Sequence, residues 1–256
     1  MSEKDLKNKP LVEAIYELRW KLDEVQKGVF LDPHYQLSIG QLYNSLKNEY
    51  QHHQLLPNAH MPLELAGHVV QHQFRVSENN WPLIQFGPGI ITVNDTESYL
   101  WEDFYGRIKR AVEALYNAYA SSQYGLKPFS ILLRYIDAIE FDFEKENAFD
   151  FLKDYLKTTI KFDEDLFECT KVRNFPLFFD LRFAFESTLP EGLIQLRFAR
   201  GKKNETNALI METNVQYINE HELTREVIEK WTNEAHNLTH KWFFKMIEGE
   251  LRKRFE

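Results

Sequence analysis

The chain opens with an alternation of apolar and polar residues that is typical of a half-buried β-strand. Apolar side chains at Val12, Ala14, Tyr16, Leu18 and Trp20 alternate with polar ones. Apolar residues at helical spacing then predict a helix over 37–52. Strand-like segments follow at 64–76, 81–87 and 89–94, and the last two are separated by glycine and proline at 87–89.

A long helix is predicted over 98–120, because apolar residues recur there at intervals of three and four. Ser98 is the predicted N-cap residue. Glu102 and Asp103 lie in the first turn, where negative charge is favourable against the helix dipole.

The same order of elements begins again after a break at 125–128. A strand is predicted at 130–143, a helix at 148–160, and strands at 178–186 and 193–200 around a hairpin turn at 189–192. A further strand at 208–218 leads to a long helix that begins near 222. The sequence therefore predicts an α+β fold that arises by tandem duplication. Each repeat unit consists of a strand, a helix, three strands and a long helix. Each half has an antiparallel sheet with long helices packed on one face.

The two predicted halves are 1–125 and 126–256. The alternative is one continuous domain in which the elements alternate this way by chance. The halves share little residue identity, so only the order of elements supports the duplication.

Polar side chains stand in the middle of several predicted strands, where an apolar core would make unpaired polar groups costly. One interpretation is a solvated sheet face. The other is a concave polar surface that holds an anionic ligand or a peptide. The candidate ligand-binding residues are Gln73, Arg75, Gln85, Arg134, Arg182 and Arg197.

Histidines suggest metal binding only weakly. Five of the nine lie within 52–72, but four residues of strand between His68 and His72 span roughly 13 Å, too far for one ion. A histidine-rich surface loop is the better interpretation. His236 and His240 are one helical turn apart, as in zinc sites on helices, but no acidic residue shares their side. We therefore expect no metal and no cofactor.

The final helix carries two apolar stripes. Phe243, Ile247 and Leu251 form the second one, which requires a partner. Burial within the chain is the favoured explanation, a second subunit comes next, and a ligand is the third.

Composition excludes several classes of protein. With 256 residues, 43% of them hydrophobic, the chain has enough apolar surface to fold. A net charge of -8 argues against nucleic-acid binding. Serine-hydrolase, phosphate-loop and zinc-protease motifs are absent. Cys169 is the single cysteine, which fits a reducing compartment. With no signal peptide or membrane span in the sequence, we expect a cytoplasmic protein.

Four stretches together resemble a bacterial family: KPLVEAIYELRW, WPLIQFGPGIITVND with YLWEDFYGRIKRAVEAL, LLRYIDAI, and ALIMETNVQY with EAHNLTHKWFFKMI. The chain is similar to the sporadically distributed TIGR family of uncharacterised bacterial proteins of about this length. Asp137 and Glu212 depart from the Asn and Asp often found there. The resemblance implies no reaction or site residues, and the family's patchy distribution implies accessory work in defence or on mobile elements.

These observations favour a non-catalytic ligand-binding or protein-binding module that forms a homodimer. Its ligand would be an anionic small molecule or an unidentified protein partner. Whether the chain has any catalytic activity stays open. The alternative is a metal-dependent hydrolase or nuclease-like enzyme that uses histidine and carboxylate groups.

Overall fold

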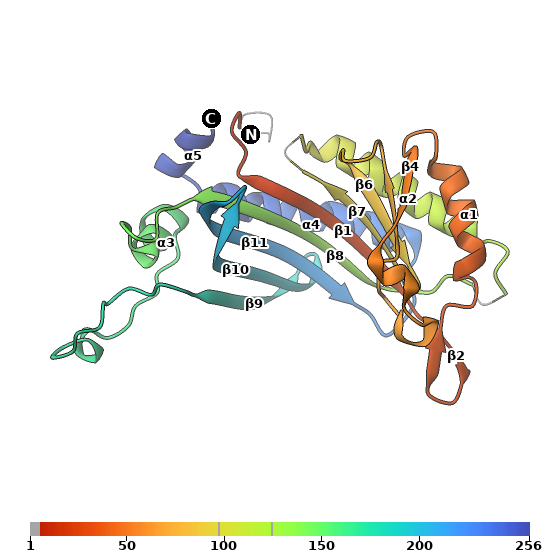
Figure 1. The fold of residues 1–256 in the computed structure, drawn as a ribbon, viewed down its shortest axis with the longest axis horizontal. Coiled ribbons are helices and arrows are strands. Elements are labelled where there is room, and N and C mark those ends of the chain that lie inside the picture. Colours follow the sequence, from red (N-terminus) through yellow and green to blue (C-terminus); the bar gives the residue numbers. More distant parts are fainter. Residues whose placement is uncertain (1–5, 97, 124) are drawn as a thin grey trace. The chain divides into compact units, whose positions relative to one another are not determined.

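The computed structural model describes residues 6–96, 98–123 and 125–256, which form a mixed α+β structure with antiparallel strands (Figure 1). The strands are β1 (Leu11–Trp20), β2 (Asp23–Gln26), β3 (Val29–Leu31), β4 (His52–Leu55), β5 (His72–Arg75), β6 (Leu83–Gly87), β7 (Ile90–Asp95), β8 (Pro128–Glu140), β9 (Asp180–Thr188), β10 (Glu191–Lys203) and β11 (Thr206–Ile218). The α-helices are α1 (Tyr35–Leu46), α2 (Trp101–Tyr119), α3 (Ala148–Leu156), α4 (Arg225–Met246) and α5 (Glu250–Phe255). Short 3-10 turns are η2 (Pro57–His60), η3 (Leu63–Leu65) and η4 (Glu164–Leu166).

The chain folds into two compact units that interleave in sequence. Unit 1 consists of Met1–Val12, Tyr135–Val215 and Glu234–Glu256, and unit 2 of Glu13–Arg134 and Gln216–Asn233. Four elements, β1, β8, β11 and α4, contribute residues to both units. The α+β class and the antiparallel sheet are confirmed, whereas the tandem duplication stays a prediction.

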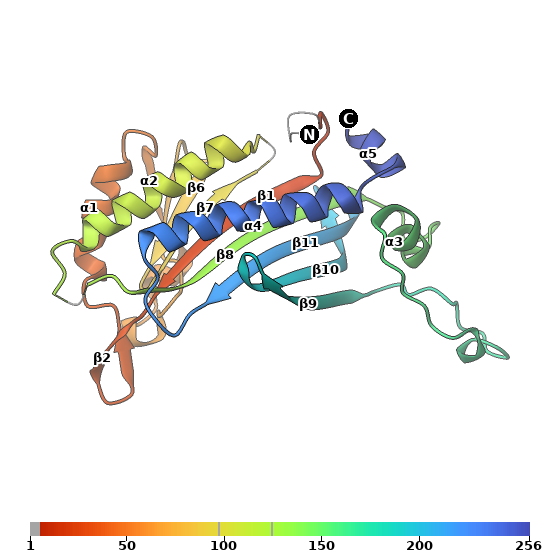
Figure 2. The same cartoon turned by 180° about the vertical axis from the view of Figure 1, so that it is seen from behind.

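In unit 2 the strands β4, β5, β6, β7 and β1 are neighbours in that order, and every pair is antiparallel. One row across these strands brings Phe74, Ile84, Val93 and Tyr16 into register, and all four are fully buried. Rings of α1 pack on this face, since Tyr35 contacts Phe86 and Tyr43 contacts Phe74. Helix α2 packs against β7 (Figure 2). This face of the unit 2 sheet is therefore its core.

The predicted strand at 64–76 is wrong over its first part, because only His72–Arg75 is extended. A 3-10 turn occupies Leu63–Leu65, and His68 adopts a left-handed φ of 59°. A second turn, which contains His68, is closed by a hydrogen bond from Val69 N to Ala66 O. The chain then runs beside Gly87 so closely that a Cβ there would lie 2.0 Å from Val69 O.

Helix ends differ from the sequence prediction by a few residues. Helix α1 ends at Leu46 instead of continuing to 52, and α2 starts at Trp101 with Leu100 as its N-cap residue, so the Ser98 cap is wrong. The reason is a turn in which Tyr99 N donates to Thr96 O before the helix begins. None of the described helices is both long and apolar enough to cross a membrane.

In unit 1 the strands β8, β11, β10 and β9 are neighbours in that order, and β9 is the last of them. The predicted hairpin is confirmed, because β9 and β10 pair from Thr188↔Glu191 to Asp180↔Ala199. The core of unit 1 gathers side chains from the sheet and from α3, α4 and α5. Ile247 and Leu251 belong to this core and are almost fully buried, so the rest of the chain covers this part of the second stripe.

Candidate functional site

A row of polar side chains crosses the unit 2 sheet on the face opposite the core. Its register is set by the pairs Gln54↔Gln73, Gln73↔Gln85, Gln85↔Thr92 and Thr92↔Glu17. Side chains alternate between the two faces of a strand, and this row lies one residue away from the buried row of Phe74 and Ile84. We call Gln54, Gln73, Gln85, Thr92 and Glu17 the polar row.

Hydrogen bonds along the strands hold this surface in place. Arg75 Nε donates to Gln73 Oε1 at 2.8 Å, and Thr92 Oγ1 donates to Asn94 Oδ1 at 2.7 Å. Asn94 Nδ2 in turn donates to Glu13 Oε1 at 2.8 Å. Gln73, Thr92 and Asn94 are only 6%, 5% and 4% exposed. Buried polar groups are tolerated when they are hydrogen-bonded, so the surface is ordered before any ligand arrives.

Arg75 lies at one end of this surface. Besides Gln73, its guanidinium donates to Asn80 O at 3.3 Å and lies over the Trp81 ring at 5.7 Å. These partners carry no full negative charge. The positive charge of Arg75 is therefore positioned but not neutralised by them.

Arg182 and Arg197 form a second group, in unit 1, as a directly opposed cross-strand pair. Both donate to Asp180, Arg182 at 3.1 Å and Arg197 at 2.9 Å, and Arg197 also donates to Glu212 at 3.2 Å. These arginines hold the pKa of the Asp180 carboxyl far below its usual range. Two carboxylates thus balance the two guanidinium charges, and an anion would have to displace Asp180.

The six candidate residues fall into separate groups. Gln73, Arg75 and Gln85 lie together on β5 and β6. Arg134 lies on β8 at the end of the first segment of unit 2, and its side chain is half-buried. Because Arg182 and Arg197 belong to unit 1, the structure supports two candidate surfaces, one in each unit.

Two pairs of histidines make contacts that are typical of side-chain packing. His53 Nε2 and His72 Nδ1 are 2.8 Å apart, and burial followed by the neighbouring His53 lowers the pKa of His72 to about 4. These residues lie on β4 and β5, so the interpretation as a surface loop is wrong for them. Within the described ranges, no group of three or more His, Cys, Asp or Glu side chains is placed to hold a metal ion.

His236 and His240 share one side of α4, as their spacing predicts, with ring centroids 5.5 Å apart. The hydroxyl of Tyr135 lies 3.1 Å from His236 Nδ1. Burial, and then the nearby His240, lowers the pKa of His236 to about 3. A neutral, buried imidazole with a tyrosine partner fits a role in packing.

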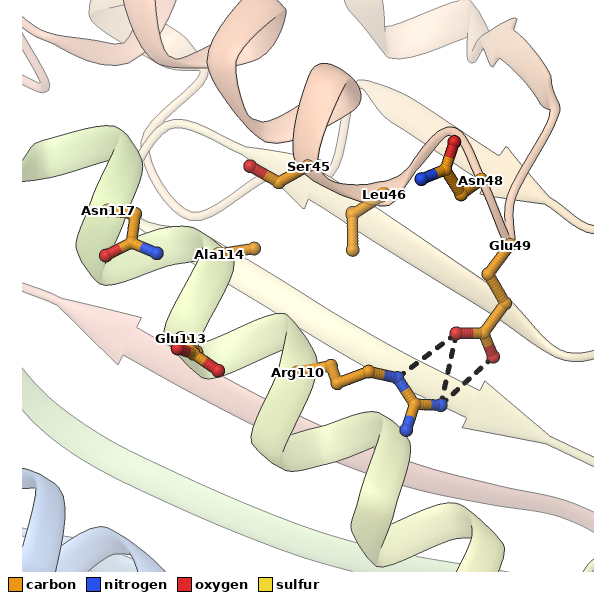
Figure 3. Close-up of a pocket in the computed structure, with 8 residues that line it drawn as sticks. All are labelled: Ser45, Leu46, Asn48, Glu49, Arg110, Glu113, Ala114 and Asn117. Carbon is orange, nitrogen blue, oxygen red and sulfur yellow. Dashed lines mark hydrogen bonds and ion pairs between the residues drawn. The ribbon is translucent and has the colours of Figure 1, made fainter.

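A surface groove of about 350 Å³ lies between α1 and α2 (Figure 3). Arg110 donates to both carboxylate oxygens of Glu49 at 3.1 Å, as the dashed lines in Figure 3 show. Arg107 joins Glu49 at 3.8 Å and Asp95 at 2.6 Å. The ion pairs of Glu49 connect the segment after α1 to α2, and the pair of Arg107 with Asp95 connects α2 to β7.

Asp137 is a residue whose environment the sequence interpretation missed. It lies within β8, which continues to Glu140, and it is only 4% exposed. Burial raises the pKa of its carboxyl to about 7, against a smaller opposing effect of Lys203. The sequence did contain a signal for this burial. Asp137 lies an even number of residues after Ile131 and Leu133, so in a strand it shares their buried face.

No family model matches this chain, and no curated protein matches it either. The resemblance to the sporadically distributed TIGR family therefore stays a prediction.

Proposed function

We propose that this chain is a non-catalytic binding module whose polar row binds an extended segment of a protein partner. The observation that carries the proposal is the register of five polar side chains across five strands. A glutamine amide offers both donors and an acceptor, which suits the alternating donors and acceptors of a peptide backbone. The ordered hydrogen bonds beneath the row reduce the entropy lost on binding.

The distribution of charge favours a protein segment over the anionic small molecule. Arg182 and Arg197 are already paired with Asp180 and Glu212. On the unit 2 surface, Arg19 donates to Glu17 at 2.7 Å, and Glu13 adds a second carboxylate on the same strand. Neither surface therefore offers the excess of positive charge that strong anion binding requires.

We also propose that the protein is a homodimer. Unit 1 exposes large apolar side chains at Phe178, Phe185 and Leu189. Phe185 lies on β9, and Phe178 and Leu189 lie just before and just after it, so an association surface would follow this strand. This proposal is independent of the ligand of the polar row.

The test of the polar row is selection from a displayed library of random peptides on the purified protein. Enriched peptides are expected to bind Gln54→Leu/Gln85→Leu roughly five- to 150-fold more weakly, because two accessible amides of the polar row are lost at roughly 0.5–1.5 kcal/mol each. Calorimetry with one synthetic peptide measures the dissociation constant.

The matched control is Gln195→Leu, the same change on β10 in unit 1, which is expected to leave peptide binding unchanged. Failure to enrich any peptide, or equal affinity for the double variant, would contradict the proposal. Titration with inorganic phosphate tests the anionic ligand separately, with Arg182→Ala/Arg197→Ala as its variant.

A further inference from the structure

Strand β9 is the edge strand of the unit 1 sheet. It spans nine residues, and among the described residues the strand order ends there, next to β10 (Figure 1). Edge strands are usually protected by short length, charged side chains (lysine above all), proline or a bulge. The sequence DLRFAFEST has neither proline nor lysine, and its pairing with β10 is regular throughout. Its outer edge can therefore accept another strand.

The sequence of β9 is complementary to itself in the antiparallel direction. If two copies meet with Ala184 opposite Ala184, then Arg182 of each copy lies opposite Glu186 of the other. In the same register Phe183 lies opposite Phe185 of the second copy. Opposite charges and aromatic pairs are the favourable cross-strand combinations, and the small residue stands at the centre.

We infer that β9 pairs with β9 of a second copy of this chain, antiparallel and centred on Ala184. A two-fold axis then lies at Ala184, as an isologous contact requires. The backbone groups of both edges are satisfied by each other, which is how β-strand addition gains affinity.

The side chains of β9 are placed for this contact. Phe185 is 48% exposed, yet its ring is held edge-on against Trp242 with centroids 5.7 Å apart. Arg182 is exposed, and its contacts to Asp180 orient the guanidinium. Both side chains are therefore ordered and accessible before association.

Exposed apolar residues flank the strand at matching positions. Phe178 is 74% exposed just before β9, and Leu189 is 69% exposed just after it. In the antiparallel arrangement the start of one β9 lies beside the end of the other. Phe178 of one copy and Leu189 of the other therefore lie at the same end of the paired strands.

This inference rests on the proposed homodimer and does not depend on the ligand of the polar row. Native mass spectrometry and light scattering measure the subunit number at micromolar concentration, and a dimer is the expected result. Arg182→Glu and Glu186→Arg are each expected to raise the dimer dissociation constant at least about tenfold, because they place like charges opposite each other. The double variant Arg182→Glu/Glu186→Arg restores the pairing and is expected to recover the dimer.

The matched control is Lys202→Glu/Glu205→Lys, which exchanges an exposed ion pair at the β10–β11 turn and is expected to leave the dimer intact. A monomeric wild-type protein would overturn both the homodimer and the strand pairing. A dimer that persists unchanged in both single variants overturns the strand pairing alone.

A cross-link tests the register directly. In a Cys169→Ser background, Ala184→Cys places two thiols on directly opposed residues, whose Cα atoms are about 4.5–5.5 Å apart in antiparallel strands. That distance suits a disulfide, so oxidation is expected to give a covalent dimer. Ser187→Cys is the control, because its two copies lie six residues apart along the paired strands, roughly 20 Å. A dimer that Ala184→Cys does not cross-link, or that Ser187→Cys cross-links equally well, overturns the register.

Discussion

The carboxyl group of Asp137 makes the stability of the folded protein depend on pH. The side chain is buried in β8, and burial raises its pKa to about 7 from an ordinary value of 3.8. The unfolded chain releases this proton at lower pH than the folded chain does. The contribution of Asp137 to stability is therefore fully present below about pH 4 and is lost as the pH rises through about 7.

We predict that Asp137→Asn raises the free energy of unfolding at pH 8 and leaves it nearly unchanged at pH 4. The shift of about three pKa units corresponds to about 4 kcal/mol as an upper value. Urea unfolding at a series of pH values measures the difference. Asp142→Asn, at an exposed position in the loop after the same strand, is the control and is expected to leave the slope between pH 4 and 8 unchanged. An equal slope in Asp137→Asn and the wild type would contradict the prediction.

At the scale of elements, regular hydrophobic patterns predicted strands and turns correctly. A segment whose path depends on a close backbone contact was predicted wrongly. The alternation in 12–20 and the turn at 189–192 correspond to β1 and to the β9–β10 hairpin. The segment 64–76 looked equally apolar, yet only β5 is extended there. Its path is set by contact with the backbone at Gly87, and a contact between distant parts of the chain leaves no periodic trace in the sequence.

Two glycines are predicted to respond oppositely to alanine. Gly87→Ala forces a Cβ against Val69 O and is expected to lower the free energy of unfolding by about 2 kcal/mol or more. Gly106→Ala lies inside α2, where a Cβ meets only Arg110 Nη1 at 3.5 Å, and is expected to raise it by about 0.5–1 kcal/mol. Thermal and urea unfolding measure both. A stabilising Gly87→Ala would show that the backbone there can move apart.

At the scale of the whole molecule, the candidate ligand-binding residues stay a prediction, and the structure shows how they are arranged. Alternation alone placed Gln73 and Arg75 on one face of a strand, whereas the register with Gln85 on β6 is a feature of the structure. Glu212 pairs with Arg197 through the sheet register, which the sequence does not state. The contact between Asp180 and Arg182 could have been predicted from the sequence, because residues two positions apart in a strand lie on the same face.

We predict that the sequence halves 1–125 and 126–256 do not fold when they are produced separately. Unit 2 needs 216–233, where Leu223 N donates to Pro128 O and Arg225 lies over the Tyr116 ring at 4.0 Å. Fragment 1–125 lacks this segment and would expose the side chains that it covers. Circular dichroism and amide hydrogen exchange of each fragment, with the full chain as control, measure folding. A cooperatively folded 1–125 fragment would instead support two independent halves.

The interleaving of the units has a consequence for synthesis on the ribosome. Unit 1 takes its first segment from residues 1–12 and its last from 234–256, and unit 2 closes only with 216–233. Neither hydrophobic core can be completed while only the first two hundred or so residues have left the ribosome. The early strands β1 and β4 to β7 can pair with one another, but the apolar faces of both units stay incompletely covered until α4 leaves the exit tunnel, a period in which a chaperone that shields exposed apolar surface would have its greatest effect.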